Sequence, residues 1–248
     1  MDEYLKDLRN NLEGGVHGPC MTELIGSLDA AYRVVIRQPP KGPLVFGRFL
    51  LICRKSMLSA ATLVAQTQPE DSVGITRRAV EAARVALAVK LNDQNALQWT
   101  AYQERHDRWI KRQQGEKPKP FRMEFTDIKG EPLIDELDRW LGILSDAYVH
   151  FTPEFYDRLD WDERIGPDGD GQIFLNYFHR DAREVEQHFN TLAAVHGSIL
   201  KTFDRCFDGG ISRDPEKLAA VNQFWGTAKR FNDDYQKRYG SRPQADGG

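Results

Sequence analysis

Mainly apolar residues recur at intervals of three and four along most of the chain, the spacing of one face of an α-helix. One long stripe consists of Val185, Phe189, Leu192, His196, Ile199, Phe203 and Phe207. Another consists of Leu218, Val221, Trp225, Ala228, Phe231, Tyr235 and Tyr239. We expect both stripes to face the core. Strand-like alternation is confined to residues 161–178, so the pattern predicts an all-α fold, a bundle of about seven or eight helices with one small β-hairpin near 161–178.

Proline, glycine and capping residues divide the chain into separate predicted helices. We expect helices over residues 2–13, 22–37, 43–67, 75–91 (approached from Pro69), 93–114, 131–150 and 180–207, and a last helix whose stripe reaches Tyr239. Asp93 is the expected N-cap of its helix, and Asp214 with Pro215 is the expected start of the last helix. Asp208-Gly209-Gly210 ends the helix before it, so the last two helices are predicted to form an antiparallel hairpin.

The length of 248 residues, with 40% hydrophobic and 29% charged residues, suits one globular domain with a sizeable core. We expect a single helical domain over residues 1–240, a hairpin inserted at about 160–178, and a flexible tail at 241–248. The most apolar segment, "PLVFGRFLLICRKSMLSAATLVA", carries Arg48, Arg54 and Lys55, which would be costly at the centre of a bilayer. This segment is therefore predicted to be a buried helix of the core.

The net charge and the cysteines limit which partners and which cellular compartment we expect. The net charge of −3 gives no overall electrostatic reason to bind nucleic acid or an anionic membrane, although it leaves room for a local basic patch. The three cysteines, Cys20, Cys53 and Cys206, form no CxxC, which predicts free thiols rather than a disulfide framework or a zinc site. The charged start "MDEYLKDLRN" does not resemble a secretory signal. We expect a cytoplasmic protein with no cofactor, no metal and no membrane partner.

The segment "ILSDAYVHFTPEFY", residues 143–156, raises the question of whether His150 belongs to a site. Asp146 lies one turn earlier and could hold the imidazole, and a helix C-terminus also favours its charged form. Thr152 and Pro153 then have the character of a new helix start. Two interpretations stay open: a structural joint between helices, and a histidine that binds a ligand.

Arg77, Glu81 and Arg84 fall within one narrow wedge of the helix that contains "TRRAVEAARVALAVK". Two guanidinium groups placed together could bind a carboxylate or a phosphate. With His150 they form the candidate ligand site of a small-anion-binding protein. The competing interpretation is a solvated helix face, with Arg77 and Glu81 as an ordinary ion pair one turn apart.

The motif "REVEQH" has four residues between Arg183 and His188. This spacing resembles the signature of HEPN ribonucleases, helical proteins in which such a pair attacks RNA at a dimer interface. The resemblance implies Arg183 and His188 as a catalytic pair. Glu184 departs from the polar residue that usually follows the arginine in that family.

A second resemblance rests on "RRAVEAARVAL", followed by a helix that ends in "LSDAYVHFTP". In these features, which include Arg78, Glu81, Ser145 and His150, residues 45–205 are similar to a group of bacterial all-helical proteins. That resemblance implies no established activity.

Three further sets of residues have structural interpretations. His196 is expected to be a core histidine with one hydrogen-bonded partner. Trp99, Tyr102 and Trp109 have helical spacing and are expected in the core rather than on a stacking platform. The basic stretch "RHDRWIKRQQGEKPKPFR" could contact nucleic acid, but a solvated helix end is the favoured interpretation.

Motifs of common enzymes are missing from the sequence, including the nucleotide-binding P-loop, the HExxH metal motif and the GxSxG elbow. Whether the protein is an enzyme therefore stays open. The leading prediction is a cytoplasmic binding or interaction module whose partner is a second copy, as a homodimer, or another protein. A HEPN-like RNA nuclease and a small-anion-binding protein are the alternatives.

Overall fold

The computed structural model describes residues 19–66, 68–110, 128, 130–146, 161–165, 171–175 and 182–240. The helices of this part are α2 (Pro19–Arg37), α3 (Leu44–Ala65), α4 (Pro69–Leu91), α5 (Asp93–Ile110), α6 (Pro132–Asp146), α8 (Ala182–Cys206) and α9 (Pro215–Tyr239). They dominate the described residues, which confirms the all-α prediction. The predicted helix over 2–13, His150 and the tail at 241–248 lie outside the described residues.

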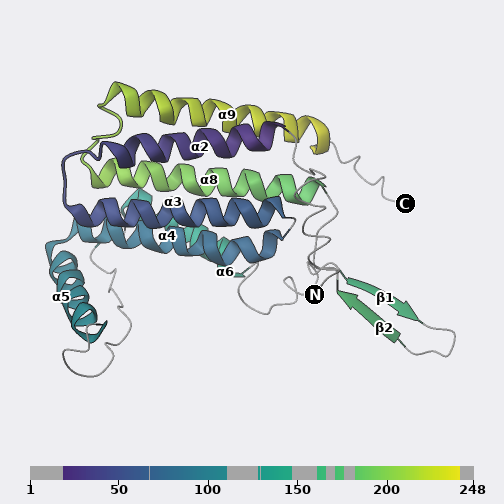
Figure 1. The fold of residues 1–248 in the computed structure, drawn as a ribbon, viewed down its shortest axis with the longest axis horizontal. Coiled ribbons are helices and arrows are strands. Elements are labelled where there is room, and N and C mark those ends of the chain that lie inside the picture. Colours follow the sequence, from purple (N-terminus) through teal and green to yellow (C-terminus); the bar gives the residue numbers. More distant parts are fainter. Residues whose placement is uncertain are drawn as a thin grey trace.

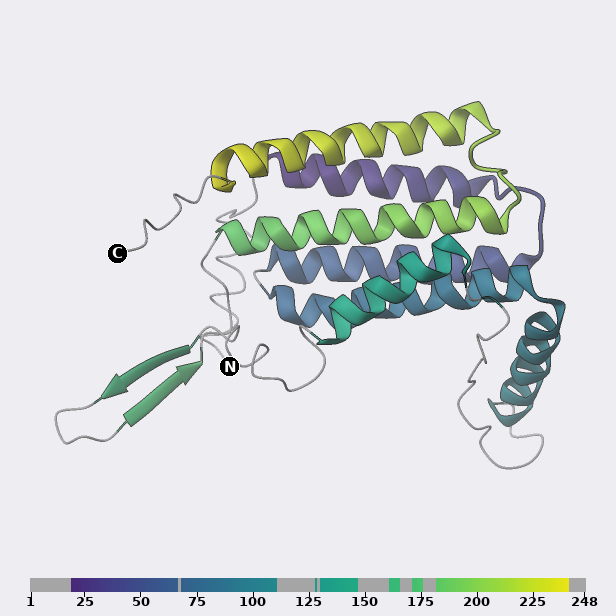
Figure 2. The same cartoon turned by 180° about the vertical axis from the view of Figure 1, so that it is seen from behind.

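The long helices lie side by side in one bundle (Figures 1 and 2). α3 and α4 form an antiparallel pair joined by a short turn, and α8 packs against both. α2 packs against α9 on one side and against α3 and α8 on the other. α6 crosses α4 and α8 on the face that Figure 2 shows, while α5 leaves the bundle at the end of α4. α8 is therefore the central helix, with α2, α3, α4, α6 and α9 packed around it.

The central position of α8 follows from its sequence pattern. Every member of the stripe predicted for this helix is buried, and His196 and Phe203 have no exposed surface. Ala193, Leu200 and Thr202 lie outside the stripe and are buried as well, because α8 has neighbours on several sides. Burying one large apolar side chain stabilises a fold by roughly 2 kcal/mol. The predicted core stripe of α8 is confirmed.

The stripe predicted for α9 coincides only in part with the face that enters the core, since Phe231 and Tyr235 are buried as predicted but other members are not. Phe224, which is not part of that stripe, has no exposed surface, whereas Leu218 is 37% exposed and Trp225 is only half-buried. α9 packs mainly against α2, and Arg230 of α9 pairs with Glu23 of α2 at 2.6 Å. The packing of α9 on α2 leaves Trp225 at the edge of α9 that contacts α8 at Gly197. Trp225 is therefore half-buried and packs against the core, rather than lying within it as predicted.

The turn from α8 to α9 follows the predicted pattern. Asp208 and Gly209 adopt left-handed backbone angles, with φ of 53° and 76°. The Asp204 carboxylate accepts hydrogen bonds from the N–H groups of Ile211 and Ser212, each at 2.9 Å. These interactions reverse the chain, and the predicted antiparallel helical hairpin is confirmed.

The hydrogen bonds at the starts of α9 and α5 test two predicted N-caps. Asp214 caps α9 as predicted, since its carboxylate accepts from the N–H groups of the second and third helical residues at 3.0 and 3.2 Å. At α5 the cap is Asn92, whose side chain accepts from the N–H of Gln94 at 2.8 Å. The prediction of Asp93 as the N-cap is wrong, because Asn92 already satisfies that N–H and Asp93 is the first helical residue.

α3 contains the most apolar segment of the chain and buries one side of it, including Leu50, Cys53 and Met57. It is a core helix, as predicted. None of the described helices combines the length and the apolarity that crossing a membrane requires.

Two five-residue strands lie between α6 and α8 in the chain. β1 (Trp161–Ile165) and β2 (Gly171–Leu175) pair antiparallel, with Trp161 opposite Leu175 and Ile165 opposite Gly171. They fall within residues 161–178, where the sequence predicts a hairpin. In both views the strands lie apart from the helices (Figures 1 and 2).

The aromatic residues of α5 are less buried than predicted. Trp99, Tyr102 and Trp109 are half-buried, and Asn95 is the buried residue among those of α5. Trp99 packs on Phe49 of α3 with ring centroids 5.0 Å apart. The prediction that all three are core residues is wrong, because α5 packs mainly along the end of α4, with Trp99 reaching Phe49 of α3.

His196 lies in the centre of the core as predicted. Its Nδ1 shares a hydrogen bond of 2.7 Å with the hydroxyl of Tyr32, and both side chains are completely buried. Burial disfavours the charged imidazole and lowers the pKa of His196 to about 3. The residue is therefore neutral in the folded protein near pH 7.

This burial predicts acid sensitivity. In the unfolded chain the imidazole binds a proton below its ordinary pKa of about 6.5, but in the folded protein it does so only near pH 3. The stability contributed by neutral His196 is thus complete above pH 6.5 and is lost as the pH falls toward 3, by up to about 1.4 kcal/mol per pH unit.

The measurement is urea unfolding of the parent and His196→Gln between pH 7 and about 4, a range set by that linkage. Glutamine retains a hydrogen-bonding group beside Tyr32 but does not titrate. We expect the free energy of unfolding of the variant to fall less steeply with decreasing pH. Equal slopes would contradict a neutral, buried His196.

Candidate functional site

The two arginines of the α4 wedge, Arg77 and Arg84, form ion pairs within the fold. Arg77 pairs with Glu81 at 3.3 Å, one turn away on the same helix. Arg84 donates from Nη2 to the Asp138 carboxylate of α6 at 3.1 Å, so it links α4 to α6. His150, the fourth residue of the predicted anion site, lies outside the described residues. The structure therefore places the wedge next to α6. The anion site of Arg77, Glu81, Arg84 and His150 stays a prediction.

Arg183 and His188 occupy the first two turns of α8 and are both half-buried. Both take part in interactions with neighbouring groups. The nuclease hypothesis for this pair also stays a prediction.

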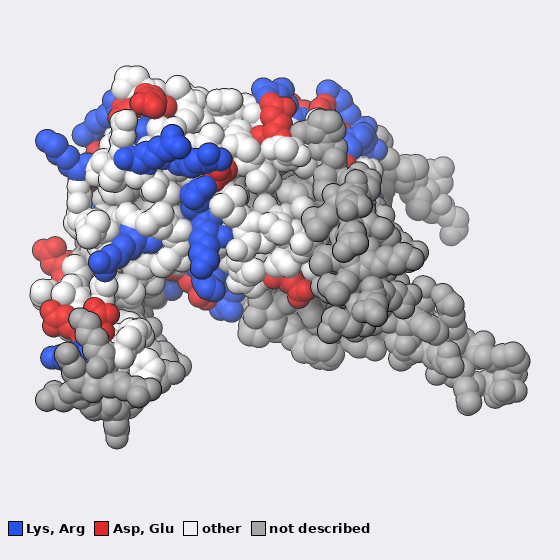
Figure 3. Space-filling view, in the orientation of Figure 1, with Lys and Arg blue, Asp and Glu red and all other residues white. Residues whose placement is uncertain are grey.

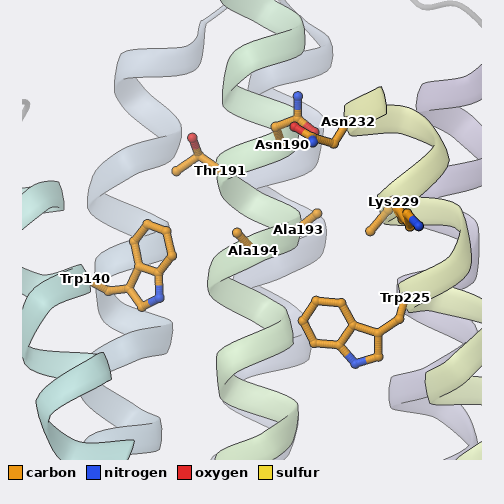
Figure 4. Close-up of a pocket in the computed structure, with 9 residues that line it drawn as sticks. Trp140, Asn190, Thr191, Ala193, Ala194, Trp225, Lys229 and Asn232 are labelled. Atoms are coloured by element: carbon orange, nitrogen blue, oxygen red, sulfur yellow. The ribbon is translucent and has the colours of Figure 1, made fainter. Parts of the chain in front are cut away.

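A groove runs along α8 between α6 and α9, with a volume of about 440 Å³. Its lining residues are Trp140, Asn190, Thr191, Ala193, Ala194, Trp225, Ala228, Lys229 and Asn232. Figure 4 shows Trp140 on α6 and Trp225 on α9 to either side of the small residues Ala193 and Ala194 of α8. The groove is open to solvent and has tryptophan side walls and an alanine floor.

Trp140 is fixed in place by a short hydrogen-bond chain. Its indole Nε1 donates to the Ser198 hydroxyl at 3.1 Å, and that hydroxyl donates to Glu136 Oε1 at 2.5 Å. Ser198 is buried and belongs to α8, while Trp140 and Glu136 belong to α6. Because the polar edge of the indole is bound to α8, its carbon face is left to form the wall of the groove.

Trp225 lies against the backbone of α8 at Gly197. A Cβ at Gly197 would be 2.7 Å from Cζ2 of the indole and closer still to Cη2, so only glycine leaves room for the ring. The Lys201 ammonium is 5.2 Å from the ring centroid, a cation–π distance, and Phe224 packs beside the ring at 5.1 Å. The Trp225 wall is therefore held in place by its neighbours, as the Trp140 wall is.

The polar groups of the groove gather at one end. Figure 4 shows the carboxamides of Asn190 and Asn232 there, with Thr191 nearby and Lys229 on α9. Neither carboxamide has a hydrogen-bond partner among the described residues, whereas the Thr191 hydroxyl donates to the Gln187 carbonyl at 3.0 Å. The two amides are available to a ligand, and each offers both a donor and an acceptor.

The lining residues include no cysteine, histidine or carboxylate. Within the described ranges, no three metal-ligating side chains come together either. Lys229 is the charged residue of the lining.

A second groove of about 410 Å³ lies between α2 and α3 and is lined mainly by apolar residues, including Met21, Leu58 and Phe189. Its carboxylate, Asp29, is already bound by Arg33 and Arg54. Burial acts to raise the pKa of Asp29, but the hydrogen bonds from Arg54 and Arg33 outweigh it and hold that pKa below its usual value. This groove offers fewer available polar groups than the first.

The periodicity of the sequence does not reveal the groove beside α8, because it places Trp225 in a stripe that is expected to face the core. The signal that could have identified it is the set of small residues Ala193, Ala194 and Gly197 on one side of α8. Small residues let neighbouring rings approach a helix closely. The small residues do not reveal which helices flank α8.

Gly197→Ala should force the Trp225 indole out of its position. We expect a loss of about 1–3 kcal/mol in the free energy of unfolding from overpacking, with a changed indole emission spectrum. Gly26→Ala is the matched control, since a Cβ there has no atom within 4 Å, and it should gain up to about 1 kcal/mol from helix propensity. A Gly197→Ala protein as stable as Gly26→Ala would contradict the close contact.

No family model, no curated protein and no solved structure matches this chain. The functional inference therefore depends on the geometry of the groove itself.

Proposed function

We propose that the protein is a cytoplasmic binding module that holds an extended peptide segment of a partner protein in the groove between α6, α8 and α9. The observation that carries the proposal is the pair of available carboxamides, Asn190 and Asn232, at one end of a groove walled by two tryptophans. The free thiols of Cys20, Cys53 and Cys206 are in line with a cytoplasmic location.

The carboxamides favour a peptide because their chemistry matches that of a peptide backbone. An asparagine side chain presents a carbonyl acceptor and an N–H donor in one plane, as a backbone amide does. An extended segment has unpaired N–H and C=O groups of its own that need such partners. Asn190 and Asn232 can therefore bind the backbone without regard to the peptide's sequence.

The tryptophans supply selectivity for side chains. Successive side chains of an extended peptide point in opposite directions, so neighbours would contact the Trp140 wall and the Trp225 wall in turn. Indole faces bury large apolar areas at little cost in conformational entropy. The floor at Ala193 and Ala194 leaves space for the peptide backbone between them.

The charge of the groove favours an acidic segment. Lys229 lines it, Lys201 lies beside Trp225, and no aspartate or glutamate is among the lining residues. A carboxylate near the Lys229 end would be attracted to this side and repelled by no group of the lining. We therefore expect peptides that combine apolar residues with at least one Asp or Glu.

The test is selection from a display library of short random peptides, followed by measurement of Kd by fluorescence anisotropy. Asn190→Ala combined with Asn232→Ala should weaken the selected peptides by roughly 30-fold, since it removes several hydrogen bonds of about 1 kcal/mol each. Trp225→Ala should weaken them as well. Asn222→Ala is the control, because Asn222 is an exposed residue of α9 that does not line the groove.

Thermal unfolding of each variant establishes that the fold is intact. Selected peptides that bind the double asparagine variant as tightly as the parent would contradict the proposal. So would a selection that enriches no peptide.

A further inference from the structure

A basic stretch of the chain coincides with exposed aliphatic side chains on the outer face of α3. Residues 30–69 contain no Asp or Glu, and their basic residues are Arg33, Arg37, Lys41, Arg48, Arg54 and Lys55. Lysine and arginine atoms accordingly run across the surface over α2 and α3 (Figure 3). The net charge of −3 conceals this local concentration of positive charge.

Only part of this charge is balanced inside the structure. Asp29 pairs with Arg33 at 2.6 Å and with Arg54 at 2.8 Å, so one carboxylate is shared by two guanidinium groups. The remaining basic residues, Arg37, Lys41, Arg48 and Lys55, are exposed and have no ion pair within the described ranges. A net excess of positive charge therefore faces solvent.

Large aliphatic side chains lie among these cations. Leu44 is 76% exposed, Leu51 is 49% exposed and Ile52 is 42% exposed. Their spacing from Arg48 and Lys55 is three or four residues, which places all five on one face of α3. That face alternates aliphatic and basic side chains and is opposite to the buried side of the helix.

We propose that this face of α3 docks the protein on the surface of an anionic lipid bilayer. Lysine and arginine are attracted to negatively charged headgroups, and leucine and isoleucine gain free energy by entering the boundary between headgroups and acyl chains. The proposal revises the expectation of no membrane partner, which rested on the net charge of the whole chain.

A bilayer explains the two kinds of side chain together. The phosphates of a nucleic acid would bind the cations but give exposed Leu44, Leu51 and Ile52 nothing to pack against. This face of α3 also carries no aromatic side chain on which a base could stack. The exposed aliphatic residues therefore favour a lipid bilayer over a nucleic acid as the partner of this face.

Docking through α3 is compatible with the groove beside α8. α6 lies on the face seen in Figure 2, whereas the basic surface over α2 and α3 is on the face seen in Figure 3, so the two sites point to different sides. A bound bilayer would leave the groove open. The docking surface and the peptide groove share no residue, so either can fail without the other.

The experiment is cosedimentation of the full chain with phosphatidylcholine vesicles, with and without roughly 30% phosphatidylserine. We expect binding only to the anionic vesicles, with a loss on raising the salt concentration from about 0.05 to 0.5 M. Arg48→Glu combined with Lys55→Glu should lower the partition coefficient at least tenfold, or about 1.4 kcal/mol. Leu51→Ser with Ile52→Ser should also lower it severalfold, although it leaves the charge unchanged.

The matched control is Arg139→Glu with Lys237→Glu, which changes the net charge equally at exposed residues of α6 and α9. It should bind the anionic vesicles nearly as the parent does. Equal losses in the control and in the α3 charge variant would overturn the proposal, as would no vesicle binding by the parent. Undiminished vesicle binding by the Leu51/Ile52 variant would show that the aliphatic side chains do not enter the bilayer, which would also overturn it. Binding of duplex RNA in place of vesicles would assign the face to a different polyanion and overturn it as well.

Discussion

The burial of α8 on several sides is the constraint on which the rest of the structure depends. Its apolar stripe, with Phe189 and Phe203, faces the core, and small residues on another side let Trp225 approach its backbone at Gly197. α2, α3, α4, α6 and α9 all pack on this one helix, so α8 links the α3–α4 pair to the α2–α9 pair. The groove exists because α6 and α9 contact α8 without closing over it.

Local patterns could predict the helices and several of their ends. Periodicity identified the buried stripe of α8, and the Asp214–Pro215 pair identified the start of α9, because both depend on residues close in sequence. The orientation of α9 could not be predicted in this way. Trp225 and Phe224 are neighbours in the chain, and the packing of α9 on α2 decides which of them is buried.

At the sites, too, contacts within one helix could be predicted from the sequence, whereas contacts between helices could not. The pairing of Arg77 with Glu81 is local and was anticipated, whereas the partner of Arg84 is Asp138, on another helix. The peptide groove depends on three helices, and no spacing within one of them indicates that Trp140 and Trp225 lie on either side of α8. The proposed lipid face of α3 was visible as a run without acidic residues, but its exposure required the structure.

Together these features describe a well-packed central helix. Beside it lies the groove proposed to hold a peptide, and another face of the bundle carries the α3 surface proposed to dock on an anionic bilayer. Hydrogen–deuterium exchange of the full chain tests the central role of α8 most directly, because amides of the most buried helix open only when the whole fold opens. The slowest exchange is predicted in α8 between Leu192 and Phe203, with faster exchange in α5. Exchange in that part of α8 as fast as in α5 would contradict the account.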